Sequence, residues 1–126
     1  MKNVLGNWQS QTYALLRMVA GFMFMCHGLQ KVFGILGGTR ADFTSLGGAA
    51  GIIELVAGAL ILVGFQTSLA AFLSSGTMAV AYFIAHQGQG ALPIQNGGEL
   101  AVLYCFVFLF LAARGDGIWS LGGGKE

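Results

Sequence analysis

The chain has 126 residues, of which 56 % are hydrophobic and only 9 % are charged. Soluble domains usually carry about 25 % charged residues, and a soluble fold of this size leaves too much surface in water to hide so much apolar area. The formal net charge of +1 excludes a nucleic-acid-binding protein, which needs a clustered basic face. The composition therefore predicts a single domain, residues 1–126, embedded in a lipid bilayer.

Four apolar segments approach the length of about 20 residues that an α-helix needs to cross the hydrocarbon core. They cover residues 13–34, 46–65, 67–85 and 97–113. The first segment is the most polar, and we expect Arg17 and Lys31, near its two ends, to extend their charged groups to the membrane interface. The predicted fold is an all-α polytopic membrane protein, a bundle of four transmembrane helices.

The connections between these segments differ in length. Only the stretch from Gly64 to Thr67 joins the second and third segments, which predicts a tight helical hairpin, whereas residues 34–48 and 86–98 form longer loops at the other end. Lysine and arginine concentrate on the cytoplasmic side of membrane proteins. With both termini inside, the inner side holds Lys2, Arg17, Arg114 and Lys125, and the outer side holds Lys31 and Arg40. We therefore expect both termini in the cytoplasm, and an N-terminus that is retained because no cleavage site follows its apolar run.

Polar side chains from all four segments are predicted to meet at the outer end of the bundle, because successive helices run in opposite directions. They are His27, Lys31, Glu54, His86, Asn96 and Glu99. A charge at the centre of a membrane helix costs about 2.5–3.5 kcal/mol, and such residues are tolerated where they face the bundle interior and pair. We expect the six to line a binding pocket; alternatively, they only hold the helices together through ion pairs.

Two cysteines, Cys26 and Cys105, each lie about seven residues from the outer end of their segment, or about 10 Å deep. Equal depth allows a reversible disulfide, although buried free cysteine also behaves as a small hydrophobe. Two histidines and two carboxylates resemble a metal site in outline. No Glu-x-x-His motif of a di-iron bundle is present, so no metal is predicted, and only a mononuclear site stays open.

Glycines in the second segment follow helical spacing. Gly47 and Gly51 are four residues apart, and Gly51 and Gly58 lie two turns apart on much the same face. Small residues let helices approach closely in membranes, where association gains nothing from the hydrophobic effect. The spacing therefore predicts a close helix–helix contact along this face.

Short motifs follow one another from Tyr13 to Leu121. They are Leu15-Leu16-Arg17 with Gly21, His27-Gly28 with Lys31, Phe33-Gly34, then Gly51, Glu54, Gly58 and Gly64, then His86, Gly90 and Pro93, and finally Asn96-Gly97-Gly98-Glu99, Leu103-Tyr104-Cys105 and Gly115 to Trp119-Ser120-Leu121. The Asn-Gly-Gly-Glu run followed by Leu-Tyr is the most specific, since glycine and an acid rarely occur together in an apolar helix. In these motifs the chain resembles the DoxX family of small four-helix bacterial membrane proteins.

The resemblance implies a protein of the bacterial inner membrane that is linked with redox chemistry. The family takes its name from a subunit of a thiosulfate:quinone oxidoreductase, and some relatives are partners of thiol and superoxide enzymes. The hypothesis is a quinone- or thiol-linked membrane subunit whose outer pocket binds a quinone headgroup or a small polar ligand. Lys31 and the histidines would donate hydrogen bonds or protons there, while Glu54 and Glu99 would set their protonation.

Whether the chain is itself an enzyme, as an oxidoreductase subunit, stays open at this point. One alternative is a non-catalytic scaffold that holds soluble redox enzymes at the membrane. Another is a small-solute transporter, which would have to form a homo-oligomer because four short spans make a narrow bundle.

Overall fold

The computed structural model describes residues 2–124, and within that range the chain is helical and contains no strand. The elements in chain order are η1 (Gly6–Trp8), α1 (Gln9–Phe33), α2 (Leu46–Val63), α3 (Thr67–Ala81), η2 (Tyr82–His86), η3 (Gln87–Gln89), α4 (Pro93–Asn96) and α5 (Glu99–Arg114). Of these, η1 and η3 are 3₁₀ turns, η2 is a π-helical turn that continues α3, and α4 is a single turn. The prediction of an all-helical chain is confirmed.

Three helical segments among the described residues are long and apolar enough to cross a membrane. They are Gly6–Phe33, Leu46–Val63 and Thr67–Gln89, and they correspond to the first three predicted spans. The predicted fourth span forms α5, whose 16 residues fall short of the roughly 20 that a crossing helix needs. Gly97 and Gly115 flank this helix with φ of 75° and 84°, which limits its length. A multi-pass membrane protein is confirmed, but the count of four crossing helices is not.

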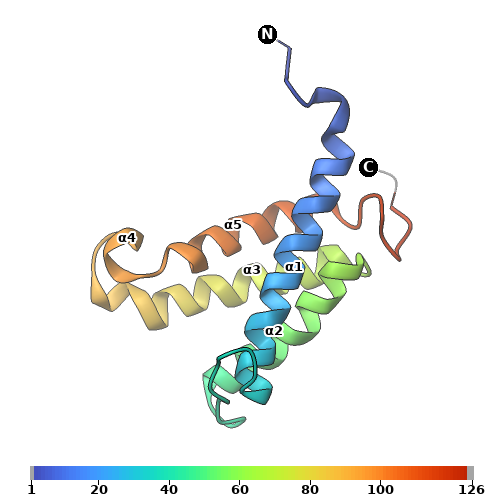
Figure 1. Cartoon of the computed structure of the whole chain (residues 1–126). Helices are drawn as coiled ribbons and strands as arrows, with labels where there is room; N and C mark the ends of the chain where they lie inside the picture. The colour runs from blue at the N-terminus through green and yellow to red at the C-terminus, as the bar shows by residue number, and fades with distance from the viewer. Residues whose placement is uncertain (1, 125–126) are drawn as a thin grey trace.

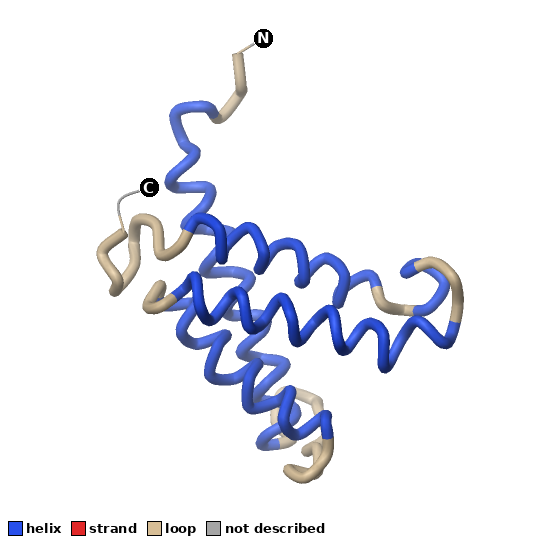
Figure 2. Tube along the Cα trace, turned by 180° about the vertical axis from the view of Figure 1, so that it is seen from behind, coloured by secondary structure: helices blue, strands red, loops and turns tan. Residues whose placement is uncertain are grey.

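The helices form two antiparallel pairs. α1 packs mainly against α2, and α3 packs mainly against α5. The pairs meet near the α2–α3 turn and diverge from there, so that the α4 end of one pair and the α1–α2 loop of the other lie apart (Figures 1 and 2). The chain is therefore two helical hairpins joined at one end, rather than four helices parallel along their whole length.

The turn between α2 and α3 is as tight as the sequence predicts. Gly64 ends α2 with a φ of 73°, in the left-handed region. The Gly64 N–H donates to the Ile61 carbonyl, and the Phe65 N–H donates to the Leu60 carbonyl. This pair of hydrogen bonds is the Schellman arrangement, which satisfies carbonyls that would otherwise be free at the helix end.

Glycines bring α1 and α2 into backbone contact. A Cβ on Gly21 would lie 2.5 Å from the Leu62 nitrogen, and one on Gly58 would lie 2.5 Å from the Met25 nitrogen. Gly28 likewise has no room for a side chain. Close approach of this kind is what small residues provide in membrane helices. The predicted role of Gly58 is confirmed.

Gly51 belongs to the same contact, whereas Gly47 does not. A Cβ on Gly51 would lie 2.7 Å from the Lys31 Cβ, but one on Gly47 would meet nothing closer than 3.7 Å. The expectation that Gly47 packs against a neighbouring helix is wrong, because it lies on the exposed side of the first turn of α2.

A small aromatic core joins the two pairs where they meet. Phe24 of α1, Ile61 of α2 and Phe108 of α5 are fully buried. The ring centroid of Phe24 lies 4.6 Å from that of Phe108 and 5.3 Å from that of Tyr104. These rings fix the position of α5 relative to α1.

Residues 115–124, after α5, fold back onto the ends of the other helices. The Leu121 N–H donates to the Val63 carbonyl at 2.9 Å. Asp116 accepts a hydrogen bond from the Thr67 N–H at 2.9 Å, which caps the start of α3. The C-terminal segment thus packs against the helix ends at which the two hairpins meet.

Arg17 lies beneath this C-terminal segment and is fully buried. Its guanidinium donates to the carbonyl of Trp119 at 2.8 Å and to that of Asp116 at 3.4 Å. The expectation that Arg17 reaches the membrane interface is therefore wrong, because the folded-back chain supplies its hydrogen-bond partners inside the protein.

Candidate functional site

Lys31 and Glu54 are the two predicted site residues that form an ion pair. The Lys31 Nζ donates to Glu54 Oε1 at 3.0 Å and lies 2.9 Å from Oε2. The Glu54 side chain is 3 % exposed, whereas that of Lys31 is 36 % exposed. An ionised carboxylate buried in a membrane helix needs such a partner. The pair therefore holds a buried acid beneath a lysine that is reachable from outside.

The local structure around the pair explains how Lys31 reaches Glu54. Lys31 lies in the last turn of α1, where a positive charge is favoured by the helix dipole. Gly51 precedes Glu54 by one turn of α2 and leaves space for the aliphatic part of the lysine to cross the surface of α2. A larger residue at position 51 would push the lysine stem away from Glu54.

The loop above the ion pair is ordered by its own hydrogen bonds. The Ala41 N–H donates to the Lys31 carbonyl at 2.7 Å, which holds the loop against the end of α1. The Thr44 N–H and the Thr44 hydroxyl both donate to Asp42 Oδ1 at 2.9 Å. These two bonds lower the pKa of the Asp42 carboxyl below its usual range.

α5 contributes Tyr104, which sequence reasoning did not select as a site residue. Its side chain is 6 % exposed, and its hydroxyl has no hydrogen-bond partner within residues 2–124. His27 of α1 packs edge-on against the Tyr104 ring, with centroids 6.0 Å apart. The Leu-Tyr-Cys motif was a signal for this residue, but a tyrosine in an apolar helix is usually a packing residue. Four side chains thus surround the junction of α1, α2 and α5: His27, Lys31, Glu54 and Tyr104.

His86 and Asn96 form a second polar group in the connection between α3 and α5. The Asn96 amide is buried and donates to the Tyr82 hydroxyl at 2.9 Å and to the Gly90 carbonyl at 3.2 Å. The His86 Nδ1 lies 3.3 Å from the Asn96 carbonyl. His86 and Tyr82 belong to the π-helical turn, a feature that often occurs at functional sites. Asn96 mainly ties the loop together.

The structure does not bring the six predicted residues into one pocket. Glu99 is exposed at the first position of α5, and His86 and Asn96 lie at the far end of the α3–α5 pair. Lys31 and Glu54 lie on the α1–α2 pair, and the free ends of the two pairs diverge (Figure 1). The prediction that all six residues meet assumed that the four helices lie side by side along their full length.

An apolar cleft of about 750 Å³ lies between α2 and α3. Lys31 lies on its edge, Ile53 and Phe72 are among its apolar walls, and Ser75 and Cys105 add the polar atoms of the α3–α5 contact. A cleft with apolar walls and few polar groups is the usual form of a small-molecule site. This cleft therefore combines apolar walls with a lysine at its edge, and that lysine forms an ion pair with Glu54.

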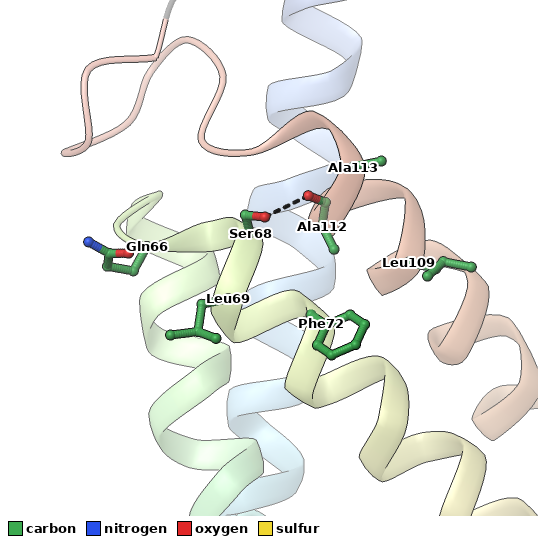
Figure 3. Close-up of a pocket in the computed structure, with 7 residues that line it drawn as sticks. All are labelled: Gln66, Ser68, Leu69, Phe72, Leu109, Ala112 and Ala113. Carbon is green, nitrogen blue, oxygen red and sulfur yellow. Dashed lines mark hydrogen bonds between the residues drawn. The ribbon is translucent and has the colours of Figure 1, made fainter.

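A second hollow lies at the end where the hairpins meet (Figure 3). Its lining residues are Gln66, Ser68, Leu69, Phe72, Leu109, Ala112 and Ala113. The Ser68 hydroxyl donates to the Ala112 carbonyl at 2.7 Å, which pins the start of α3 to the end of α5. Since none of its lining residues is ionisable, this hollow offers packing rather than chemistry.

Both cysteines are free thiols. The Cys105 Sγ lies 3.5 Å from the Ser75 hydroxyl, and the same hydroxyl donates to the Cys105 carbonyl at 2.7 Å. Cys105 thus faces α3 and the cleft. A pairing of Cys105 with Cys26 stays a prediction. Within the described range, no group of three or more His, Cys, Asp or Glu side chains is placed to hold a metal ion.

Comparisons with known proteins agree with the helical membrane architecture. The sequence profile of the DoxX family matches residues 12–87, which include α1, α2, α3 and the π-helical turn. The chain is 40 % identical over 126 residues to a protein of Haemophilus influenzae described as uncharacterized, with 94 % of each chain covered. No solved structure matches the chain. On the family match, which spans more than half of its residues, the chain belongs to the DoxX family.

Proposed function

We propose that this DoxX-family protein is a redox-associated subunit of the bacterial inner membrane that binds a quinone at the α2–α3 cleft. The observation that carries the proposal is the Lys31–Glu54 ion pair at the edge of an apolar cleft of about 750 Å³. A quinone has a polar headgroup with two carbonyl acceptors and an apolar tail. The cleft offers the matching pair of surfaces, a cation at one side and apolar walls along the rest.

Lys31 is the group that would contact the headgroup first. An ammonium has three N–H donors, and its contacts with Glu54 leave capacity for a further acceptor. Glu54 holds the lysine in place and compensates its charge, so that the headgroup meets a donor rather than an unpaired cation. His27 lies on the same face of α1, four residues before Lys31, and would be a second donor.

His86, Asn96 and Glu99 would take part in this site only if the two helix pairs closed toward each other. In the divergent arrangement they belong to the α3–α5 pair, whose free end lies away from the α1–α2 loop (Figure 1). We propose them as a second contact region, which would serve a soluble redox partner or a second copy of the chain.

The membrane arrangement that we propose has four crossings and both termini in the cytoplasm. α5 is short, but it lies antiparallel to α3, which is part of a span of sufficient length. Contacts of Ser68 with Ala112 and of Ser75 with Cys105 hold the two helices together over two turns. A helix paired in this way would cross with its partner, because locally thinned bilayer accommodates a short apolar segment.

Quinone binding by the purified protein in detergent tests the proposed function. We expect a short-tailed ubiquinone to bind the parent, measured by calorimetry, and Lys31→Met or Glu54→Gln to weaken binding about tenfold or more, since an interaction of a charged group is lost. Arg40→Met is the matched control, because Arg40 is exposed in the α1–α2 loop and does not line the cleft.

A double variant serves as the control for loss of folding. Replacing both members of a buried ion pair is tolerated better than replacing one, so Lys31→Met with Glu54→Gln should restore thermal stability without restoring binding. A parent protein that binds no quinone would exclude this function and favour the alternative of a non-catalytic scaffold.

A further inference from the structure

The folded-back C-terminal segment presents two large apolar side chains on its outer side. Trp119 is 57 % exposed and Leu121 is 75 % exposed. Residues 117–124 carry no charged side chain, so this stretch could enter a less polar environment without removing a charge from water. Single exposed apolar residues are common on proteins, but the backbone at Trp119 is unusual as well.

Trp119 is held in a strained conformation. Its φ is 55°, in the left-handed region that a bulky residue rarely adopts. The turn around it is closed by the Ser120 hydroxyl, which donates to the Gly117 carbonyl at 2.7 Å, and the Trp119 carbonyl accepts from Arg17 at 2.8 Å. A glycine would make the same backbone contacts without strain, so the fold needs the backbone here but does not need the indole.

The position of the segment along α2 indicates its depth in the membrane. α2 has 18 residues and is about 27 Å long, close to the roughly 30 Å of a hydrocarbon core. Its last residues therefore mark the edge of that core. The Leu121 N–H donates to the Val63 carbonyl and the Gly122 N–H to the Gly64 carbonyl, both at 2.9 Å. The segment thus lies at the edge of the hydrocarbon core, beside the α2–α3 turn (Figure 1).

The apolar surface of α3 that faces lipid reaches the same level. Leu69, in the first turn of α3, is 59 % exposed. Asp116, which leads into the segment, accepts a hydrogen bond from the Thr67 N–H of that turn. The exposed side chains of the segment therefore continue a surface that the bilayer covers. An indole, with an apolar ring and one N–H donor, is suited to the level of the lipid headgroups.

We propose that residues 117–122 lie flat in the interfacial layer of the bilayer, with the Trp119 indole among the headgroups and Leu121 in the outer part of the acyl chains. The partner of this surface is lipid rather than a soluble protein. Contact with the bilayer thereby helps to hold the segment over Arg17. The inference is independent of the proposed quinone function.

Fluorescence quenching tests the depth, because the chain has only two tryptophans, Trp8 and Trp119. Trp8→Phe leaves Trp119 as the single fluorophore, in vesicles whose lipids carry bromine at different depths. We expect the strongest quenching from bromine near the headgroup end of the acyl chain and little quenching by aqueous acrylamide. Efficient quenching by acrylamide alone would place the segment in water or against a soluble partner, and strongest quenching by the deepest bromine would place it in the hydrocarbon core. Either result would overturn the proposal.

Trp119→Phe gives the matched control, since it leaves Trp8. This residue precedes Arg17 by nine positions, or about 13 Å along the helix, which exceeds the roughly 5–8 Å of one interfacial layer. Trp8 should therefore be quenched more by acrylamide than by brominated lipid. Equal quenching of both tryptophans by brominated lipid would contradict the depth assigned to the segment.

Trp119→Gly separates membrane contact from folding. The glycine keeps the carbonyl that binds Arg17 and accepts the left-handed φ, so the thermal unfolding midpoint should change little. Hydrogen exchange of amides 117–122 in vesicles should become several-fold faster, because the anchor in the interface is lost. A midpoint that falls as far as in Arg17→Met would mean that the indole packs on the protein, and unchanged exchange would mean that lipid does not hold the segment; both would refute the proposal.

Discussion

Arg17 is the side chain on which the C-terminal segment depends most. It is fully buried, and two carbonyls of residues 116 and 119 accept its hydrogen bonds. Next to it, Tyr13 donates to the Gly115 carbonyl and lies beneath the Arg114 guanidinium. The charge of Arg17 is stabilised by main-chain carbonyls that reach it only when residues 115–124 are folded back.

We predict that Arg17→Met destabilises the protein and releases this segment. The carbonyls of Asp116 and Trp119 would lose two partly buried hydrogen bonds to a charged donor, each worth about 1.5–3 kcal/mol. The thermal unfolding midpoint should fall, and hydrogen exchange of amides 115–124 should quicken, measured by mass spectrometry. Arg40→Met is the comparison, because exposed arginines contribute about 0–1 kcal/mol. Unchanged exchange in Arg17→Met would show that the guanidinium does not hold the segment.

The α1–α2 pair is built on glycine contacts, whereas the α3–α5 pair depends more on hydroxyl groups. Gly21, Gly28, Gly51 and Gly58 allow backbone contact in the first pair. Ser68 and Ser75 donate to carbonyls of α5 in the second. Glycine contacts and hydroxyl hydrogen bonds both suit helices in lipid, where close packing and interhelical hydrogen bonds replace the hydrophobic effect.

Adding one methyl group distinguishes a glycine in the contact from one outside it. Gly28→Ala would place a carbon against the Leu55 backbone, so we expect a loss of about 1–3 kcal/mol from overpacking. Gly76→Ala is the matched control in α3, where nothing lies within 4 Å of the new carbon, and it should be neutral or stabilising by up to about 1 kcal/mol. Thermal unfolding in detergent compares them, and equal midpoints would contradict the contact.

The divergence of the two hairpins is the main property of the whole molecule. It separates the Lys31–Glu54 group from His86 and Asn96, and it leaves the cleft between α2 and α3. If α5 crosses the membrane together with α3, the number of crossings is even.

We therefore predict that both termini lie on the cytoplasmic side. Green fluorescent protein fused to either end should fluoresce, and alkaline phosphatase fused to either end should be inactive, because the first works in the cytoplasm and the second outside it. A C-terminal phosphatase fusion that is active beside a fluorescent N-terminal fusion would mean that α5 does not cross.

Hydropathy and residue type alone determined the membrane class, the three long apolar helices and the tight turn at Gly64. The physical reason is that these features are local: a span needs only a run of apolar residues, and a helix stop needs only a glycine that accepts a left-handed φ. The sequence also allowed the pairing of Lys31 with Glu54 to be predicted, because adjacent antiparallel helices bring the end of one beside the start of the next. The same rules predicted a fourth span over residues 97–113, but the structure forms α5 there with 16 residues, fewer than a crossing helix needs.

Only the tertiary structure decided which polar groups meet. The angle between the hairpins comes from the Phe24, Tyr104 and Phe108 rings and from the folded-back C-terminal segment, which are contacts between distant parts of the chain. The same contacts bury Arg17, which the sequence placed at the interface, and bring Tyr104 of α5 against His27 of α1. A helix's position in the sequence predicts its depth in the membrane, but its neighbours are set by packing.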